Sequence, residues 1–137
     1  MTQVGMVILV NNTSNFYESL GLTISGMRNE LSVGKNVIRV LSQPEYICFR
    51  VNPKKDSIII FPCDYSDPMS YKVPEGLLRA EHKILRIYSK AFVQETLAAN
   101  NLSTNSTYTM YGRYYPKQNL VRFDFQDAFE NRMKLDS

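Results

Sequence analysis

The segment Arg50-Val-Asn-Pro-Lys-Lys-Asp-Ser-Ile-Ile-Ile-Phe-Pro-Cys-Asp64 predicts the end of one β-strand, a tight turn and a second strand. The Asn-Pro-Lys-Lys-Asp centre has turn chemistry, and β-branched and aromatic residues follow it. The downstream segment Arg113-Tyr-Tyr-Pro-Lys-Gln-Asn-Leu-Val-Arg-Phe-Asp-Phe-Gln-Asp127 aligns with it without a gap. Pro53 then matches Pro116. We therefore interpret the chain as two related β-hairpin units.

The side chains that we expect to face inward agree between the two hairpins. The gapless alignment matches Ile58 with Val121 and Ile60 with Phe123, and Phe125 continues the second pattern. Because successive strand residues point to opposite faces, a slip of one residue would turn every inward side chain outward. The agreement favours one register for both hairpins.

Composition is that of an ordinary globular chain. The 137 residues are 44% hydrophobic and 21% charged, which suits one compact domain or two small units sharing a core. Nine Tyr and seven Phe with no Trp favour strands. The predicted class is α+β, mainly β.

The chain divides into four parts. Gln3–Val10 is an apolar run that predicts a buried strand, and the conformation of residues 11–41 stays open, with Asn36–Leu41 fitting either a helix or a strand. Pro68 and Pro74 mark a join, in which Pro74 starts a candidate short helix. The parts are a first β-rich unit (1–63), a join (64–82), a second unit (83–127) and a tail with a helical turn (128–137).

The second unit is predicted in more detail. Lys83–Tyr88 alternates as a strand, and Ser89 is the candidate N-cap of a helix over Lys90–Ala99. Thr107–Tyr115 and Leu120–Phe125 are expected to form the second hairpin.

No catalytic motif stands out. His82 is the only histidine, no nucleophile elbow is present, and the six glycines are dispersed, so a phosphate-binding loop is not expected. We expect a protein that is not an enzyme and has no cofactor and no metal site. Cys48 and Cys63 fall on strands predicted to pair, and whether they form a disulfide stays open.

Basic residues are the candidate nucleic-acid ligands. The net charge is +3, which is compatible with binding a polyanion. Each unit offers three cations that would contact phosphates: Arg28, Lys35 and Arg39 in the first, and Lys83, Arg86 and Lys90 in the second. The alternative is a solvated strand face, where Lys and Arg keep strand edges from pairing.

The order strand (Lys83–Tyr88), Ser89-Lys90, helix (Ala91–Ala99) and hairpin (Thr107–Phe125) resembles the swapped-hairpin domain of AbrB-like transcription regulators of bacteria. Asn36–Asp64 resembles a more degenerate copy. The resemblance implies that two hairpin-plus-short-helix units interlock in one swapped-hairpin-like barrel, as a monomeric pseudo-dimer or a homodimer. It also implies binding to double-stranded DNA and transcription regulation.

A protein-binding module is the alternative function. In size and style the chain also resembles small proteins of mobile elements, some of which are protein inhibitors. An exposed hairpin edge or an aromatic patch of Tyr111, Tyr115 and Phe129 would then bind a protein partner. No apolar run reaches the roughly 20 residues of a membrane span, and Met1–Asn12 lacks a secretory pattern. We therefore expect a cytoplasmic protein with no membrane partner.

Overall fold

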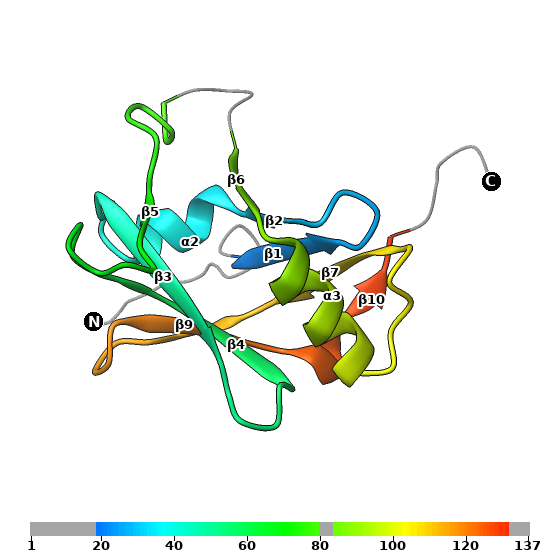
Figure 1. The fold of residues 1–137 in the computed structure, drawn as a ribbon. Coiled ribbons are helices and arrows are strands. Elements are labelled where there is room, and N and C mark those ends of the chain that lie inside the picture. Colours follow the sequence, from blue (N-terminus) through cyan, green and yellow to red (C-terminus); the bar gives the residue numbers. More distant parts are fainter. Residues whose placement is uncertain (1–18, 80–83, 132–137) are drawn as a thin grey trace.

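A computed structural model describes residues 19–79 and 84–131 (Figure 1). The fold is α+β, mainly β, with two antiparallel sheets of five strands each. The first sheet has the order β10-β7-β1-β2-β6, with bounds β1 (Gly21–Ser25), β2 (Glu30–Val33), β6 (Leu85–Tyr88), β7 (Thr107–Tyr111) and β10 (Phe129–Glu130). The second has the order β5-β3-β4-β9-β8, with bounds β3 (Tyr46–Val51), β4 (Ser57–Pro62), β5 (Tyr71–Lys72), β8 (Arg113–Tyr115) and β9 (Leu120–Asp124).

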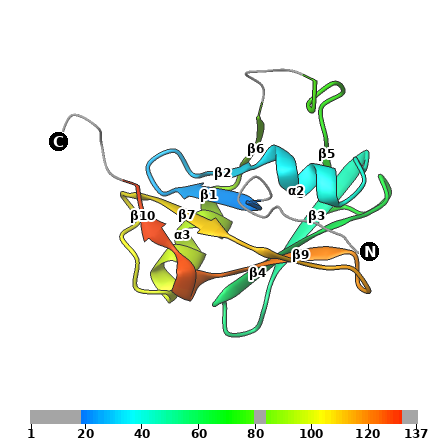
Figure 2. The ribbon, with the colours of Figure 1, turned by 180° about the vertical axis from the view of Figure 1, so that it is seen from behind.

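The sheets do not close into a barrel, so the expected barrel is wrong. Each sheet ends in two edge strands, β10 and β6 in the first and β5 and β8 in the second. Among the described residues no ladder joins these edges, and closure requires such a ladder. Both views of the ribbon show the sheets as separate layers, with β4 and β9 crossing below β1 and β2 (Figures 1 and 2).

One nearly continuous strand passes from the first sheet to the second. β7 pairs with β1, and β8 pairs with β9. Gly112 lies between them, and a Cβ there would sit 2.6 Å from the Arg122 carbonyl oxygen and 2.8 Å from the Phe123 ring. We predicted that Thr107–Tyr115 would be one strand of the second hairpin. This is wrong, because only its last three residues pair with β9.

The two hairpins share one register. Val51 pairs with Ile58 in the first, and the aligned residues Tyr114 and Val121 pair in the second. The hairpins also lie side by side, because β4 pairs antiparallel with β9. The side chains predicted to face inward are the core: Ile58, Ile60, Val121, Phe123 and Phe125 are all buried.

Within residues 19–79 and 84–131, two α-helices and a short 3₁₀ helix accompany the sheets: α2 (Lys35–Val40), α3 (Lys90–Ala99) and η1 (Phe125–Asp127). The bounds predicted for α3 are confirmed, although the Ser89 side chain makes no capping hydrogen bond. The buried residues of α3 are Val93, Thr96 and Leu97, and the adjoining Phe92 ring packs edge-on against Phe49 with centroids 4.7 Å apart.

The segment over Asn36–Leu41, left open by the sequence, forms α2 through Val40. Val37 and Ile38 are buried in the core, and tertiary packing of this kind overrides their β-branched preference for strands. Ser42, with φ of 68°, ends the helix by donating to the Arg39 carbonyl, while the Gln43 N–H donates to the Ile38 carbonyl. This pair of bonds is a Schellman motif with Ser at a position where glycine is common.

Other predictions have mixed outcomes. Residues 74–79 form turns and not a helix, with Gly76 at φ of 72°. The start of the tail is strand β10 and not a helical turn. The predicted strand Gln3–Val10 lies outside the described residues, as do His82, Lys83 and the end of the tail. Within the described ranges, no helix has the length and apolar character needed to cross a membrane.

Candidate nucleic-acid interface

Strand β6 carries Arg86 at one edge of the first sheet. Among the described strands it pairs only with β2, where Arg86 lies opposite Ser32 and Tyr88 lies opposite Glu30. Leu85 and Ile87 are buried, so alternation turns the Arg86 side chain to the outer face of the sheet, where it is exposed.

The turn between β1 and β2 brings Arg28 to the beginning of α3. The Ser89 N–H donates to the Asn29 carbonyl at 2.9 Å, and the Gln94 side chain donates to Asn29 Oδ1 at 2.8 Å. A glycine is needed at position 26, at the start of this turn, because a Cβ there would lie 2.2 Å from the Thr104 carbonyl oxygen. The turn is thus held against α3, with Arg28 on one side of the contact and Lys90 on the other.

Arg28, Arg86 and Lys90 are exposed, and none forms an ion pair with another described residue. Other cations differ: Lys55 lies 3.7 Å from Glu95, and the Arg122 Nε lies 2.9 Å from an Asp124 oxygen. Within the described part of the chain, the three cations of the β6 edge are thus not neutralised by an ion pair. We call Arg28, Arg86 and Lys90 the β6-edge cations.

Of the predicted cations, Lys35 and Arg39 lie at the other end of β2. Because β2 and β6 are antiparallel, α2 and α3 begin at opposite ends of the pair, on the order of 20 Å apart at about 3.3 Å per residue. Lys35 is half-buried, and the exposed Arg39 donates to Asn36. Arg39 also lines a shallow hollow of about 580 Å³ together with Arg113.

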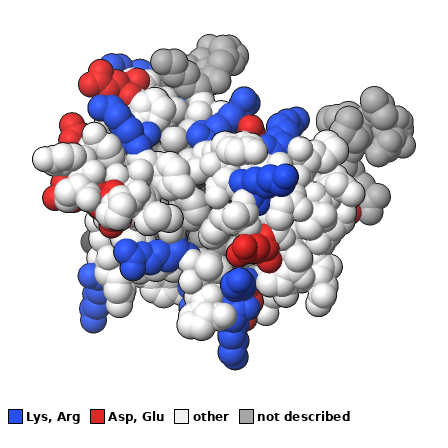
Figure 3. Space-filling model, in the orientation of Figure 1, with Lys and Arg blue, Asp and Glu red and all other residues white. Residues whose placement is uncertain are grey.

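The predicted cations form two separate groups on the surface, not one continuous basic patch. In Figure 3 the Lys and Arg side chains are spread over the visible face, with uncharged surface between them and some acidic groups close by. The structure thus brings together Arg28, Arg86 and Lys90, whereas the sequence had placed Arg28 with Lys35 and Arg39.

The aromatic candidates are also only partly together. The rings of Tyr111 and Phe129 are 6.0 Å apart on neighbouring strands β7 and β10, and both are about half exposed. The Tyr111 ring lies over Gly21, where a Cβ would be 3.5 Å from it. Tyr115 is in the other sheet, on edge strand β8.

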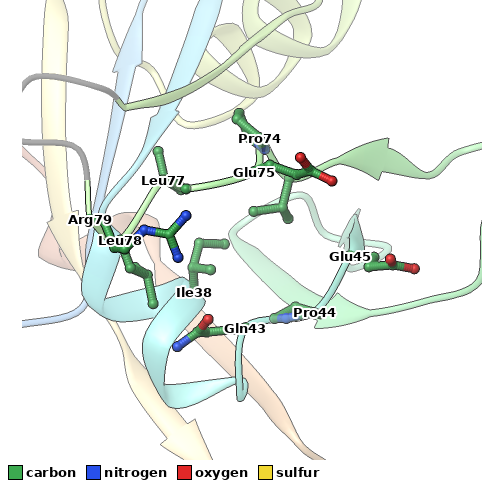
Figure 4. Close-up of a pocket in the computed structure, with 11 residues that line it drawn as sticks. Ile38, Gln43, Pro44, Glu45, Pro74, Glu75, Leu77, Leu78 and Arg79 are labelled. Atoms are coloured by element: carbon green, nitrogen blue, oxygen red, sulfur yellow. The ribbon is translucent and has the colours of Figure 1, made fainter.

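A small hollow between the end of α2 and the turns at 73–79 collects charged groups without an evident catalytic arrangement. Its volume of about 230 Å³ is below the roughly 300 Å³ at which ligand pockets begin. Figure 4 shows the Arg79 guanidinium beside Ile38, while the carboxylates of Glu45 and Glu75 lie apart from it. None of its lining residues within the described ranges is a Ser, Cys or His nucleophile.

A further cluster was not foreseen as a unit. Cys48 and Cys63 are both free, their Sγ atoms are 2.7 Å apart, and the Asp67 carboxylate is close to both. Burial, followed by hydrogen bonds to Cys63 and Asp67, raises the pKa of Cys48 to about 12. The sequence pointed to the cysteine pair, but nothing in the spacing of Asp67 marked it as their neighbour.

Comparison with known proteins adds no relative: no family model, no curated protein and no solved structure matches this chain.

Proposed function

We propose that the protein is a non-enzymatic regulator that binds double-stranded DNA through phosphate contacts. The observation that carries this proposal is the position of the β6-edge cations. Pairing of β2 with β6, and the hydrogen bond from Ser89 to Asn29, bring these three exposed charges, which have no ion-pair partner among the described residues, to one edge of one sheet.

Charge of this kind suits a duplex backbone. B-DNA presents about one phosphate per 1.7 Å of its axis, and each neutralised phosphate releases counterions. Lys35 and Arg39, on the order of 20 Å away, would extend the contact along the backbone. These contacts set affinity and orientation, whereas base contacts would be needed for sequence preference.

The arrangement of related strands supports a swapped-hairpin-like architecture as part of this proposal. Each half of the chain has a strand, a helix and then a hairpin: β2, α2 and β3–β4, and later β6, α3 and β7 to β9. Corresponding strands pair with each other, β2 with β6 and β4 with β9. Such pairing is what a local two-fold axis produces, and a monomer built this way is a pseudo-dimer of two related units.

The test is duplex affinity measured at several salt concentrations. We expect binding to weaken steeply with salt, and the double variant Arg86→Ala/Lys90→Ala to reduce the slope of log K against log salt by about 2. The matched control is Lys54→Ala/Lys117→Ala, which removes the same charge from the two exposed hairpin turns. Absence of duplex binding at low salt would refute the proposal, as would equal loss in the control.

A protein-binding function is the second candidate, and it has its own observation. The exposed ring pair of Tyr111 and Phe129 lies at edge strand β10, and aromatic residues are enriched in protein interfaces. Its test is a pull-down from the native host with the wild type and Phe129→Ser. Recovery of a single protein by the wild type alone, with no nucleic acid, would favour this function over DNA binding.

A further inference from the structure

The two cysteines occupy neighbouring positions on one face of the first hairpin. The Cys63 N–H donates to the Tyr46 carbonyl at 3.1 Å, which extends the β3–β4 ladder by one step. Cys63 is therefore opposite Tyr46, and Cys48 is two residues further along β3 on the same face. The two residues are diagonal neighbours across the ladder, and their Sγ atoms are 2.7 Å apart.

Asp67 completes the cluster from the loop after Cys63. Its carboxylate accepts the Met69 N–H at 2.9 Å and lies 4.0 Å from the Arg50 guanidinium. One ligand atom from each of Cys48, Cys63 and Asp67 falls within 4.8 Å of the others. Cys48 has no exposed surface, whereas Cys63 is half-buried, so the two thiols differ in access to solvent.

We propose that Cys48 and Cys63 are a reversible dithiol that forms a disulfide by exchange with a low-molecular-weight disulfide such as oxidised glutathione. Cys63 is the accessible thiol that reacts first, and Cys48 is the buried thiol that completes the exchange. Asp67 is the positioning residue, with its carboxylate beside both thiols.

The exchange proceeds in two balanced steps. The Cys63 thiolate attacks one sulfur of the oxidant, forming a mixed disulfide and releasing one glutathione thiolate. Cys48 then loses its proton to the released glutathione thiolate or to water and attacks Cys63 Sγ, which forms the internal disulfide and releases the second glutathione thiolate. Two protein thiols are oxidised, one oxidant disulfide is reduced to two thiols, and the two protons end on these or on water.

The geometry favours a disulfide over a metal site. Two thiolates on one tetrahedral zinc ion lie about 3.8 Å apart, because each Zn–S bond is about 2.3 Å. A disulfide needs about 2.05 Å between the sulfurs. From 2.7 Å, bonding requires a smaller movement than metal binding does.

The experiment uses the full chain, equilibrated in mixtures of reduced and oxidised glutathione and then treated with an alkylating reagent. These are the chain's two cysteines, so intact mass counts the free thiols directly. We expect two alkylated thiols in the reduced form and none in the oxidised monomer. Adding dithiothreitol should make both thiols available to alkylation again. The disulfide closes the loop between Cys48 and Cys63, and this should raise the melting temperature of the oxidised protein by about 10 °C.

Three variants separate the roles of the residues. In Cys48→Ser we expect one glutathione to remain on Cys63, whereas in Cys63→Ser the buried Cys48 should stay free. In Asp67→Asn we expect the mixed disulfide on Cys63 to be resolved faster near neutral pH, because a carboxylate that raises the pKa of Cys48 is removed, with the same final disulfide. A purely structural role for Asp67 would leave the lifetime of this mixed disulfide and its pH dependence unchanged.

Three results would overturn the proposal. The first is two thiols that remain alkylatable at every glutathione ratio in the folded wild type. The second is formation of disulfides between chains in place of the internal one. The third is a stoichiometric metal ion that must be removed before either thiol reacts. The wild-type measurement decides among these even if a cysteine variant does not fold.

Discussion

The first hairpin, β3–β4, and the second, β8–β9, share a register but not a length. Five residue pairs join β3 to β4, whereas three join β8 to β9. The alignment that matches the hairpins puts Gly112 where the first has Phe49. Phe49 stacks on Tyr71 with ring centroids 5.2 Å apart, but Gly112 leaves room for the Arg122 carbonyl and the Phe123 ring. The hydrophobic pattern thus sets the register, while one residue decides whether a strand stays in its sheet.

The largest expected effect comes from emptying matched core positions. Ile60 and Phe123 occupy aligned sites and are at most 1% exposed. We expect Phe123→Ala to lower the free energy of unfolding by about 4 kcal/mol and Ile60→Ala by about 3 kcal/mol, from lost contacts and a residual cavity. Urea unfolding measures both, with the half-buried Ile59→Ala, at about 1 kcal/mol, as the comparison. If either substitution lowered the free energy of unfolding by less than Ile59→Ala does, the two aligned sites would not be equivalent core positions.

Gly112→Ala should have the next largest effect. Its new Cβ would meet a backbone oxygen 2.6 Å away, and this oxygen cannot rotate aside, so we expect a loss of about 2 to 3 kcal/mol. Gly21→Ala is the matched control, because its Cβ would be 3.5 Å from the flexible Tyr111 ring. Thermal unfolding of both should show a clear drop only at Gly112. Equal melting temperatures would mean that the bend does not depend on glycine.

A smaller effect is expected in the turn of the first hairpin. Asn52 Oδ1 accepts the N–H groups of Asp56 and Ser57, each at 2.9 Å. Removing this acceptor in Asn52→Ala should cost about 1 kcal/mol, whereas Lys54→Ala in the same turn should change stability by less than about 0.5 kcal/mol. Chemical denaturation compares them, and indistinguishable midpoints would rule out the Asn52 contribution.

The smallest effect at neutral pH concerns the Cys48 thiol, whose aligned position in the second hairpin is the exposed Tyr111. Burial first, and then hydrogen bonding, raises the pKa of Cys48 to about 12 from an ordinary 9.0. A raised pKa favours the protonated folded state, so this stability is complete below pH 9.0 and is lost as the pH rises toward about 12. We expect reduced wild type to lose stability there more steeply than Cys48→Ala. If the free energies of unfolding of the two proteins changed with pH in parallel, this would contradict the raised pKa of Cys48.

Periodicity predicted the parts of the fold that are local. The alternation through Ile58 and Ile60 gave the buried face of β4, and good helix formers after Ser89 gave the bounds of α3. These features depend on neighbours within one element, which a sequence displays directly.

Pairing between distant segments was not predictable in the same way. Nothing in Glu30–Val33 specifies Leu85–Tyr88 as its partner, and this pairing regroups Arg28 with Arg86 and Lys90. The proximity of Asp67 to Cys48 has the same origin, because the loop after β4 leads to β5, which pairs with β3. The candidate residues were available from the sequence, but their grouping required the tertiary structure.

Each sheet combines strands from both sides of the segment between β5 and β6. The first takes β1 and β2 from before it and β6, β7 and β10 from after it, and the second likewise joins β3, β4 and β5 to β8 and β9. A chain cleaved in that segment would therefore have two fragments held by the β1–β7, β2–β6 and β4–β9 ladders. Such fragments are natural candidates for complementation: neither can complete a sheet alone, and mixing the two should restore the fold.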